Sequence, residues 1–167
     1  MNKLEVFFDY TCPYCLRGHN YLCALLPQHP GIEVVWRPCE AHPRPEGGKH
    51  SDLCIQGMLF AQEQGADLWK YQELMYAAAQ KRRIDYEDPD ALAESVKTLL
   101  ESDAFRRAIV SGRYAKAQLD LNDYAYDQNG VWALPAFRLN GHKLDSVEGV
   151  GVSQEQLAAF LSVAAGA

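Results

Sequence analysis

The sequence has no apolar run long enough to span a bilayer and no dense stripe of lysine and arginine. Its 22 acidic residues outnumber its 16 lysines and arginines, which gives a formal net charge of -6 at pH 7. An acidic surface repels phosphate backbones, so we expect no nucleic-acid partner and no membrane partner. The first residues lead directly into a strand-like pattern without an apolar leader or a cleavage site, which favours a cytoplasmic protein.

The chain also lacks the even, regularly spaced cysteines of a disulfide scaffold. It has five, and 167 residues with 48% hydrophobic content can build a core without disulfides. There is no second C-x-x-C pair, so a four-thiolate zinc site is not indicated. The cysteines are Cys12, Cys15, Cys23, Cys39 and Cys54. We expect Cys23 to be buried on the first helix.

The hydrophobic pattern of the first 50 residues predicts strand, helix and strand. Residues 3–9 alternate as a strand does, residues 14–26 carry a helical apolar stripe, and residues 32–36 form a second strand. This order favours parallel pairing of the two strands through a right-handed crossover. Residues 38–51 are rich in proline and glycine and predict a loop.

The rest of the chain predicts a helical block followed by a hairpin and a last helix. Residues 52–128 are helical in pattern, with breaks near 65–67, 85–90, 102–103 and 111–112. A strand at 136–139, the turn Asn140-Gly141 and a partner strand at 143–147 follow. Ser153 and Gln156 have the spacing of a capping box at the start of a helix that ends near residue 163.

One cysteine pair has a spacing with a clear chemical use, Cys12-Pro13-Tyr14-Cys15, at the change from strand to helix. A thiol at a helix N-terminus is stabilised as thiolate by free N–H groups and the helix dipole, which should lower its pKa below roughly 8.5. Pro13 suits the first helical turn. Cys15 lies one turn on, so the two sulfurs can form a disulfide.

The mechanism that this arrangement predicts is thiol–disulfide exchange. The Cys12 thiolate attacks a substrate disulfide and forms a mixed disulfide, and Cys15 then attacks Cys12 and releases the reduced substrate. The same steps in reverse oxidise a dithiol. We therefore expect dithiol or disulfide substrates and no cofactor other than the redox-active cysteine pair; the oligomeric state is not indicated.

Several segments resemble the DsbA-like thioredoxin-fold oxidoreductases, in particular the cytoplasmic FrnE-like branch. They are residues 8–15 around the cysteine pair, residues 36–38 and 43–47 after the second strand, and residues 111–114 and 129–141 before and within the third strand. The resemblance covers nearly the whole chain and implies an α/β thioredoxin-like fold, β-α-β … β-β-α, with a helical insertion. The implied domains are residues 1–50 and 130–167 for the thioredoxin-like part and 51–129 for the insertion.

The resemblance also assigns a substrate-binding role to residues outside the cysteine pair. Pro135 aligns with the family's cis-proline, which implies that Leu134 lies beside Cys12 with its backbone open to an extended substrate. Pro13 and Tyr14 would contact the substrate from the helix start. The inserted helices would form a lid beside the Cys12 surface, although we expect most of their apolar side chains to be core.

The sequence departs from the family at three positions that tune the chemistry. Tyr14 stands where the periplasmic oxidants usually have histidine, and because Pro-Tyr is common in glutaredoxins it makes glutathione a candidate co-substrate. Leu134 replaces the more usual valine or threonine. Val6 stands where thioredoxin-like proteins often bury an acid, while the nearby Asp9 either assists proton transfer to Cys15 or binds loop backbone, the role that we favour.

Two alternative functions remain open from the sequence. Kappa-type glutathione transferases or isomerases share the fold, but they generally carry serine at the position of Cys12. A metal-binding module would use thiolates, and Cys39, His42, His50 and Cys54 have zinc-type side chains across the Pro/Gly loop. Their spacing matches no known pattern, so we expect packing for Cys54, no role for Cys39 and no metal site; a Cys39–Cys54 disulfide is a further alternative.

Overall fold

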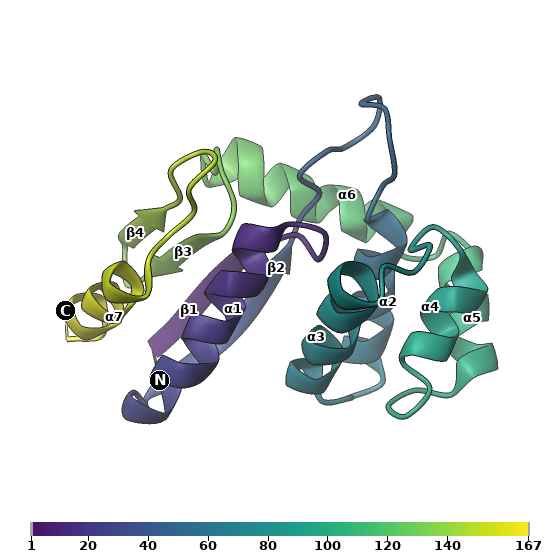
Figure 1. Ribbon diagram of the computed structural model, residues 1–167, viewed down its shortest axis with the longest axis horizontal. Helices are drawn as coiled ribbons and strands as arrows, with labels where there is room; N and C mark the ends of the chain where they lie inside the picture. The colour runs from purple at the N-terminus through teal and green to yellow at the C-terminus, as the bar shows by residue number, and fades with distance from the viewer. Residues whose placement is uncertain (1, 167) are drawn as a thin grey trace. The chain divides into compact units, whose positions relative to one another are not determined.

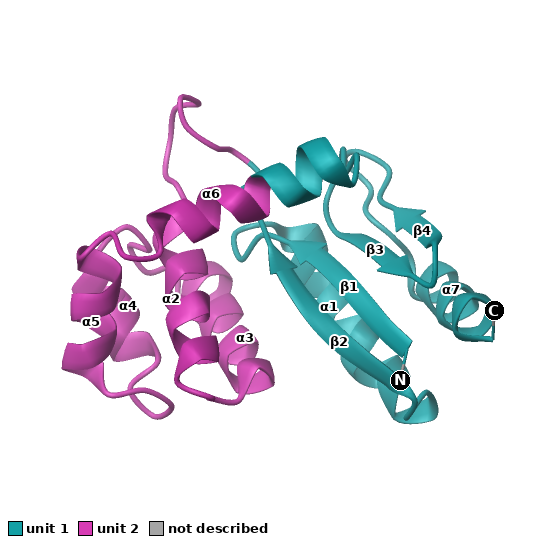
Figure 2. Cartoon of the chain, turned by 180° about the vertical axis from the view of Figure 1, so that it is seen from behind, with its two compact units in different colours: residues 1–41, 123–167 teal, residues 42–122 magenta. Residues whose placement is uncertain are grey.

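The computed structural model describes residues 2–166, which form two compact units (Figure 2). Unit 1 holds residues 2–41 and 123–166 of the described chain, and unit 2 holds residues 42–122. The second unit is thus inserted into the first. The units divide after residues 41 and 122, whereas the resemblance implies boundaries after residues 50 and 129.

Unit 1 is a four-stranded sheet with helices. In chain order its elements are β1 (Asn2–Phe8), α1 (Pro13–Leu25), the 3-10 turn η1 (Leu26–Gln28), β2 (Ile32–Pro38), the π-helical turn η3 (Tyr124–Gln128), β3 (Ala136–Leu139), β4 (His142–Asp145) and α7 (Gln154–Ala165) (Figure 1). The strand order is β2-β1-β3-β4. β1 and β2 are parallel, while β1–β3 and β3–β4 are antiparallel. The predicted α/β architecture is confirmed.

The two faces of this sheet have different partners. Val6 lies opposite Phe137, and the Phe137 ring comes within 3.9 Å of the position that a Cβ at Gly18 on α1 would take. α7 packs against α1, β3 and β4. Phe7 points to the other face, where its ring stacks on Tyr124 with centroids 5.9 Å apart. The strand β1 is therefore buried between two layers and brings Cys12 to the end of a rigid core.

Unit 2 is helical throughout its regular structure. Its elements are α2 (Asp52–Glu63), α3 (Leu68–Tyr76), the π-helical turn η2 (Ala77–Lys81), α4 (Pro89–Ser95), α5 (Ser102–Val110) and α6 (Ala115–Asp123), whose last residue belongs to unit 1. α2 packs against α3 and α5, and α4 packs against α5. The side chains of Asp67 and Asp88 cap α3 and α4 by accepting backbone N–H groups, which explains the breaks predicted near these residues.

The C-terminal hairpin follows the prediction except at its end. Asn140 and Gly141 have φ values of 50° and 80°, the left-handed conformation that a two-residue hairpin turn needs. β4 ends at Asp145, earlier than the expected residue 147. Ser146 follows the strand, and its hydroxyl donates to the Pro135 carbonyl oxygen at 2.5 Å. Ser153 and Gln156 form the predicted capping box of α7.

Candidate active site

Cys12 lies at the N-cap of α1, with extended backbone geometry (φ -89°, ψ 118°) and Pro13 in the first helical turn. The Cys12 carbonyl oxygen accepts the N–H groups of Cys15 at 3.1 Å and Leu16 at 3.2 Å, so the helix begins at the motif itself. The Cys12 N–H donates to the Asp9 carbonyl oxygen at 3.1 Å. Asp9, directly after β1, and the first turn of α1 thus both fix the Cys12 backbone by hydrogen bonds.

The two thiols of the motif differ in exposure and in acidity. Cys12 is half-buried, whereas Cys15 is 1% exposed. A hydrogen bond from the Cys15 side chain lowers the pKa of Cys12 against the opposing effect of burial, and the N–H groups of Cys15 and Tyr14 lower it further. Burial raises the pKa of Cys15 well above its ordinary value, and the neighbouring Cys12 adds to the rise. Cys12 is therefore the thiol that ionises first.

The strongest support for the Cys12 thiolate differs from the one expected. The helix N-terminus, the expected cause, contributes through the backbone N–H groups of the first turn. The largest effect on the Cys12 pKa comes from the Cys15 side chain, which donates to the Cys12 sulfur only while Cys15 keeps its proton. The burial of Cys15 therefore helps Cys12 to ionise.

Asp9, directly after β1, carries a buried carboxylate, and the residue is 1% exposed. Its Oδ1 accepts the N–H and the hydroxyl of Thr11, each at 2.9 Å, and its Oδ2 accepts the N–H of Ala41 at 2.7 Å. Its negative charge raises the pKa of both Cys12 and Cys15. These contacts fit the loop-binding role that we favoured, while proton transfer to Cys15 stays a prediction.

Pro135 packs against α1 one turn beyond the motif. The Leu134–Pro135 peptide bond is cis. A Cβ at Gly18 would lie 3.0 Å from Cγ of Pro135, so the close approach needs a glycine on the helix. Leu134 is 9% exposed and lies next to this contact in the chain. The placement of Leu134 beside Cys12 and its contact with a substrate stay predictions.

The loop between β4 and α7 holds the Tyr14 side chain, a feature that the sequence analysis missed. The Tyr14 hydroxyl donates to the Gly149 carbonyl oxygen at 2.9 Å. The Arg17 guanidinium lies 5.3 Å from the centroid of the Tyr14 ring and donates to the Val150 carbonyl oxygen. A Cβ at Gly151 would come within 3.2 Å of Tyr14 Cβ. The Gly-Val-Gly run at 149–151 is the only signal that a close approach was needed there.

A second buried thiol, for which no role was expected, lies near the motif. Cys39 follows β2, is 0% exposed, and its N–H donates to the Phe8 carbonyl oxygen at 2.8 Å. Burial raises its pKa, against a hydrogen bond with the Tyr126 hydroxyl. Tyr126 also donates to the Glu40 carbonyl oxygen, and burial raises its own pKa. Cys39 is thus a neutral core thiol, held between β2 and η3.

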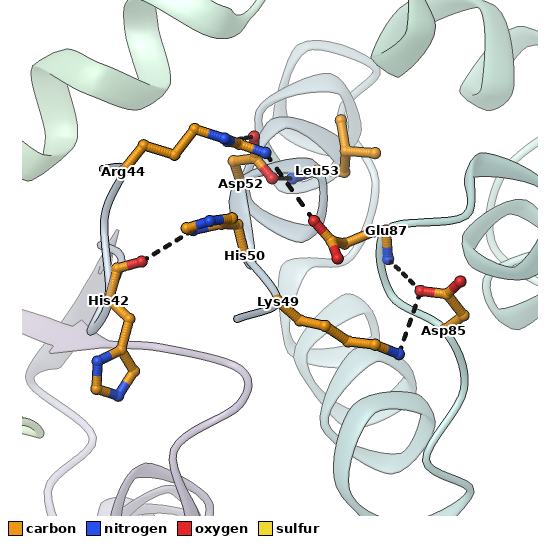
Figure 3. Close-up of polar contacts among 8 residues, drawn as sticks. All are labelled: His42, Arg44, Lys49, His50, Asp52, Leu53, Asp85 and Glu87. Carbon is orange, nitrogen blue, oxygen red and sulfur yellow. Dashed lines mark hydrogen bonds and ion pairs between the residues drawn. The ribbon is translucent and has the colours of Figure 1, made fainter. Parts of the chain in front are cut away.

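The other candidate ligands are engaged elsewhere. His50 Nδ1 lies 3.0 Å from the His42 carbonyl oxygen, within a loop of unit 2 whose other polar contacts include Arg44–Asp52 at 2.5 Å and Lys49–Asp85 at 3.4 Å (Figure 3). The His42 ring is exposed and lies 3.3 Å from the Glu46 carboxylate. Cys54 is buried on α2, where packing explains it. Over residues 2–166 there is no group of three or more His, Cys, Asp or Glu that could hold a metal ion.

One cysteine prediction is wrong. Cys23 is exposed rather than buried, because it lies on the side of α1 away from the sheet contacts made through Leu22 and Leu25. Its sulfur is 3.5 Å from His19 Nε2, one turn earlier. None of the five cysteines, all within the described residues, is in a disulfide. Within the described chain, no helix is both long enough and apolar enough to cross a membrane.

Residues 3–50 match the family model of the DSBA-like thioredoxin domain. Among solved structures, a thioredoxin-like oxidoreductase from Silicibacter pomeroyi is 22% identical, over 99% of this chain and 87% of that chain, with a TM-score of 0.72. A probable DsbA oxidoreductase from Streptomyces coelicolor is 16% identical, over 99% and 91%, with a TM-score of 0.79. A thiol-disulfide oxidoreductase from Corynebacterium diphtheriae is 15% identical, over 96% and 82%, with a TM-score of 0.73.

A comparison with curated proteins found no match. The solved structures share the fold over nearly the whole length of this chain, and the family model covers the segment that carries the cysteine motif. Over residues 3–50 the chain is thus similar to the DSBA-like thioredoxin domain, and over nearly its whole length it shares the fold of these solved structures.

Proposed function

We propose that the protein is a thiol–disulfide oxidoreductase in which Cys12 is the nucleophile and Cys15 the resolving thiol. The observation that carries the proposal is the asymmetry of the pair. The half-buried Cys12 has a lowered pKa, and the buried Cys15 has a raised pKa and donates its hydrogen bond to Cys12. A thiolate is the attacking species in disulfide exchange, and of the two motif cysteines Cys12 ionises more readily and is the more accessible in the reduced protein.

The reaction takes place in two displacements. The Cys12 thiolate attacks one sulfur of a substrate disulfide, a Cys12–substrate bond forms, and the other substrate sulfur leaves as a thiolate and takes up a proton. With Cys12 now bonded, the hydrogen bond to the Cys12 thiolate, which adds to the effect of burial on the Cys15 pKa, is lost. Cys15 then loses its proton and attacks the Cys12 sulfur, which forms the Cys12–Cys15 disulfide and releases the second substrate thiol.

The residues around the pair suggest how a substrate is held. Pro13 and Tyr14 lie in the first turn of α1. The hydrogen bonds of Tyr14 and Arg17 to the β4–α7 loop hold that turn in place. Pro135, directly before β3, lies close to α1, where a Cβ at Gly18 would be 3.0 Å from its Cγ, and Leu134 precedes it in the chain. We propose that an extended peptide binds along the backbone at Leu134 while its disulfide faces Cys12.

Exchange with a model disulfide peptide tests the function. Cys12→Ser should abolish turnover, Cys15→Ser should accumulate a mixed disulfide on Cys12, and Cys23→Ser, which removes the exposed thiol of the same helix, should act as wild type. Turnover that survives Cys12→Ser overturns the proposal. Turnover that survives loss of both cysteines together with tight glutathione binding would favour the kappa-type transferase alternative.

Three finer assignments stay predictions. They are glutathione as co-substrate, which Tyr14 suggests, the FrnE-like branch of the family, and the cytoplasmic location. Equilibration of the protein with a glutathione buffer measures the reduction potential and so the direction of electron flow. A value near that of thioredoxin indicates a reductase, and one near that of DsbA indicates an oxidase or isomerase; the two lie about 150 mV apart.

A further inference from the structure

A hollow of about 230 Å³ lies on unit 1, bordered by β1, β3, β4 and the turn between the last two strands. Its charged lining is formed by Lys3 and Glu5 of β1, Arg138 of β3 and Lys143 of β4. Glu5 lies opposite Arg138 and Arg138 lies opposite Lys143 in the strand register, so these three side chains project from one face of the sheet. Lys3, two residues before Glu5, shares that face.

The two acids near the hollow are already paired. Glu5 Oε2 accepts from Arg37 Nε at 2.7 Å and from the Tyr124 hydroxyl at 2.6 Å. Asp145 Oδ1 accepts from Arg138 Nη1 at 2.8 Å. Each of these two acids is thus offset by an arginine. Glu33 of β2 lies opposite Lys3 in the strand register, so one positive charge, that of Lys143, is left in excess. A local excess of positive charge stands out in a protein whose net charge is -6.

Arg138 supplies a second and independent indication of a ligand. The residue is 7% exposed, its Nη1 donates to Asp145 and to the Phe137 carbonyl oxygen, and its Nη2 donates to the Asn129 carbonyl oxygen at 3.1 Å. Its Nε is buried and has no partner among the described residues. A buried donor without an acceptor is unfavourable, and an anion held against this edge of the guanidinium would supply the missing acceptor.

We propose that this hollow binds a small oxyanion, a phosphate or carboxylate group, between Lys3 and Lys143 and against Arg138. The volume is below the roughly 300–1,000 Å³ of pockets for drug-sized ligands, so the ligand is compact. Arginine and lysine are the side chains that recognise carboxylate and phosphate oxygens. Lys3 lies near the start of β1 and Cys12 follows its end, so the site is separate from the cysteine pair and does not depend on the proposed redox function.

Calorimetric titration of the wild-type protein with inorganic phosphate and, separately, with succinate tests the proposal. We expect saturable binding of at least one of the two, with one site per chain; the stronger of the two identifies the preferred oxyanion. The double variant Lys3→Gln/Lys143→Gln should weaken the binding by roughly tenfold or more. Both lysines are exposed, so the variant should fold, which thermal unfolding checks.

The matched control is Lys97→Gln/Lys116→Gln, which removes the same charge from two exposed lysines of unit 2. It should bind the anion as wild type does, and both double variants should keep wild-type disulfide exchange. The proposal is overturned by the absence of saturable binding of either anion through the millimolar range. It is overturned equally if the two double variants lose affinity to the same extent, since that result would reflect net charge alone.

Discussion

Replacing Gly18 with alanine tests the contact between α1 and Pro135. In a helix interior, alanine is more favourable than glycine by roughly 1 kcal/mol, so an unhindered site would be stabilised. Here the new Cβ would lie 3.0 Å from Cγ of Pro135, a ring that cannot rotate away. Overpacking of this kind costs about 1–3 kcal/mol. We therefore expect a net loss of about 0–2 kcal/mol, with Pro135 displaced from the helix.

The assay for Gly18→Ala combines urea unfolding of the reduced protein with exchange of a model disulfide peptide. Displacement of Pro135 should slow exchange, because Leu134 moves with it. Gly57→Ala is the matched control in unit 2, where a Cβ would lie 2.4 Å from the Tyr71 hydroxyl oxygen. It should destabilise unit 2 by about 2–3 kcal/mol and leave the reactivity of the cysteine pair unchanged. A stabilised Gly18→Ala variant with wild-type exchange would refute the reasoning.

Three further substitutions have expected outcomes. Asp9→Asn removes the charge that opposes Cys12 ionisation, so alkylation of Cys12 should shift to lower pH. The lost charged hydrogen bonds should reduce the free energy of unfolding in urea by about 2 kcal/mol. An unchanged pH profile of alkylation would contradict the role of the Asp9 charge. Ser153→Ala removes the capping box of α7 and should cost about 1 kcal/mol in thermal unfolding, with no change in exchange rate. The pKa values of Cys15 and Cys39 are raised in the folded protein, so the reduced protein should lose stability as the pH rises through the ordinary thiol range, by about 1.4 kcal/mol per unit of pH and per thiol. Cys39→Ala should make this alkaline slope shallower, and a slope equal to wild type would show that Cys39 ionises freely in the folded state.

The local signals of the sequence were sufficient for most of the fold. The strand–helix change at Cys12, the Asn140-Gly141 turn and the Ser153 cap depend on residues close together in the chain, and the structure has each of them. The boundaries between the units were less predictable. The chain leaves the sheet after Pro38, and the first part of unit 1 ends at Ala41, whose N–H is bound by the Asp9 carboxylate, a contact across 32 residues that no local pattern encodes.

The same limit applies to the candidate site. The cysteine pair and Pro135 could be found from motifs, whereas the Tyr14 contact with Gly149 joins residues 135 positions apart. Cys39 carries no motif, and only the fold shows that it is buried near the pair. The exposure of Cys23 depends on which side of α1 meets the sheet, a choice that its apolar neighbours in the sequence leave ambiguous.

The difference in acidity between Cys12 and Cys15 is measured most directly by alkylating the reduced protein with iodoacetamide across a range of pH. Mass spectrometry of peptides then reports each cysteine separately. We predict that Cys12 reacts first, with a midpoint below its ordinary thiol pKa, and that Cys15 stays protected over the same range. If Cys15 reacts first, or if the Cys12 midpoint lies at or above the ordinary value, the assignment of nucleophile and resolving thiol is wrong.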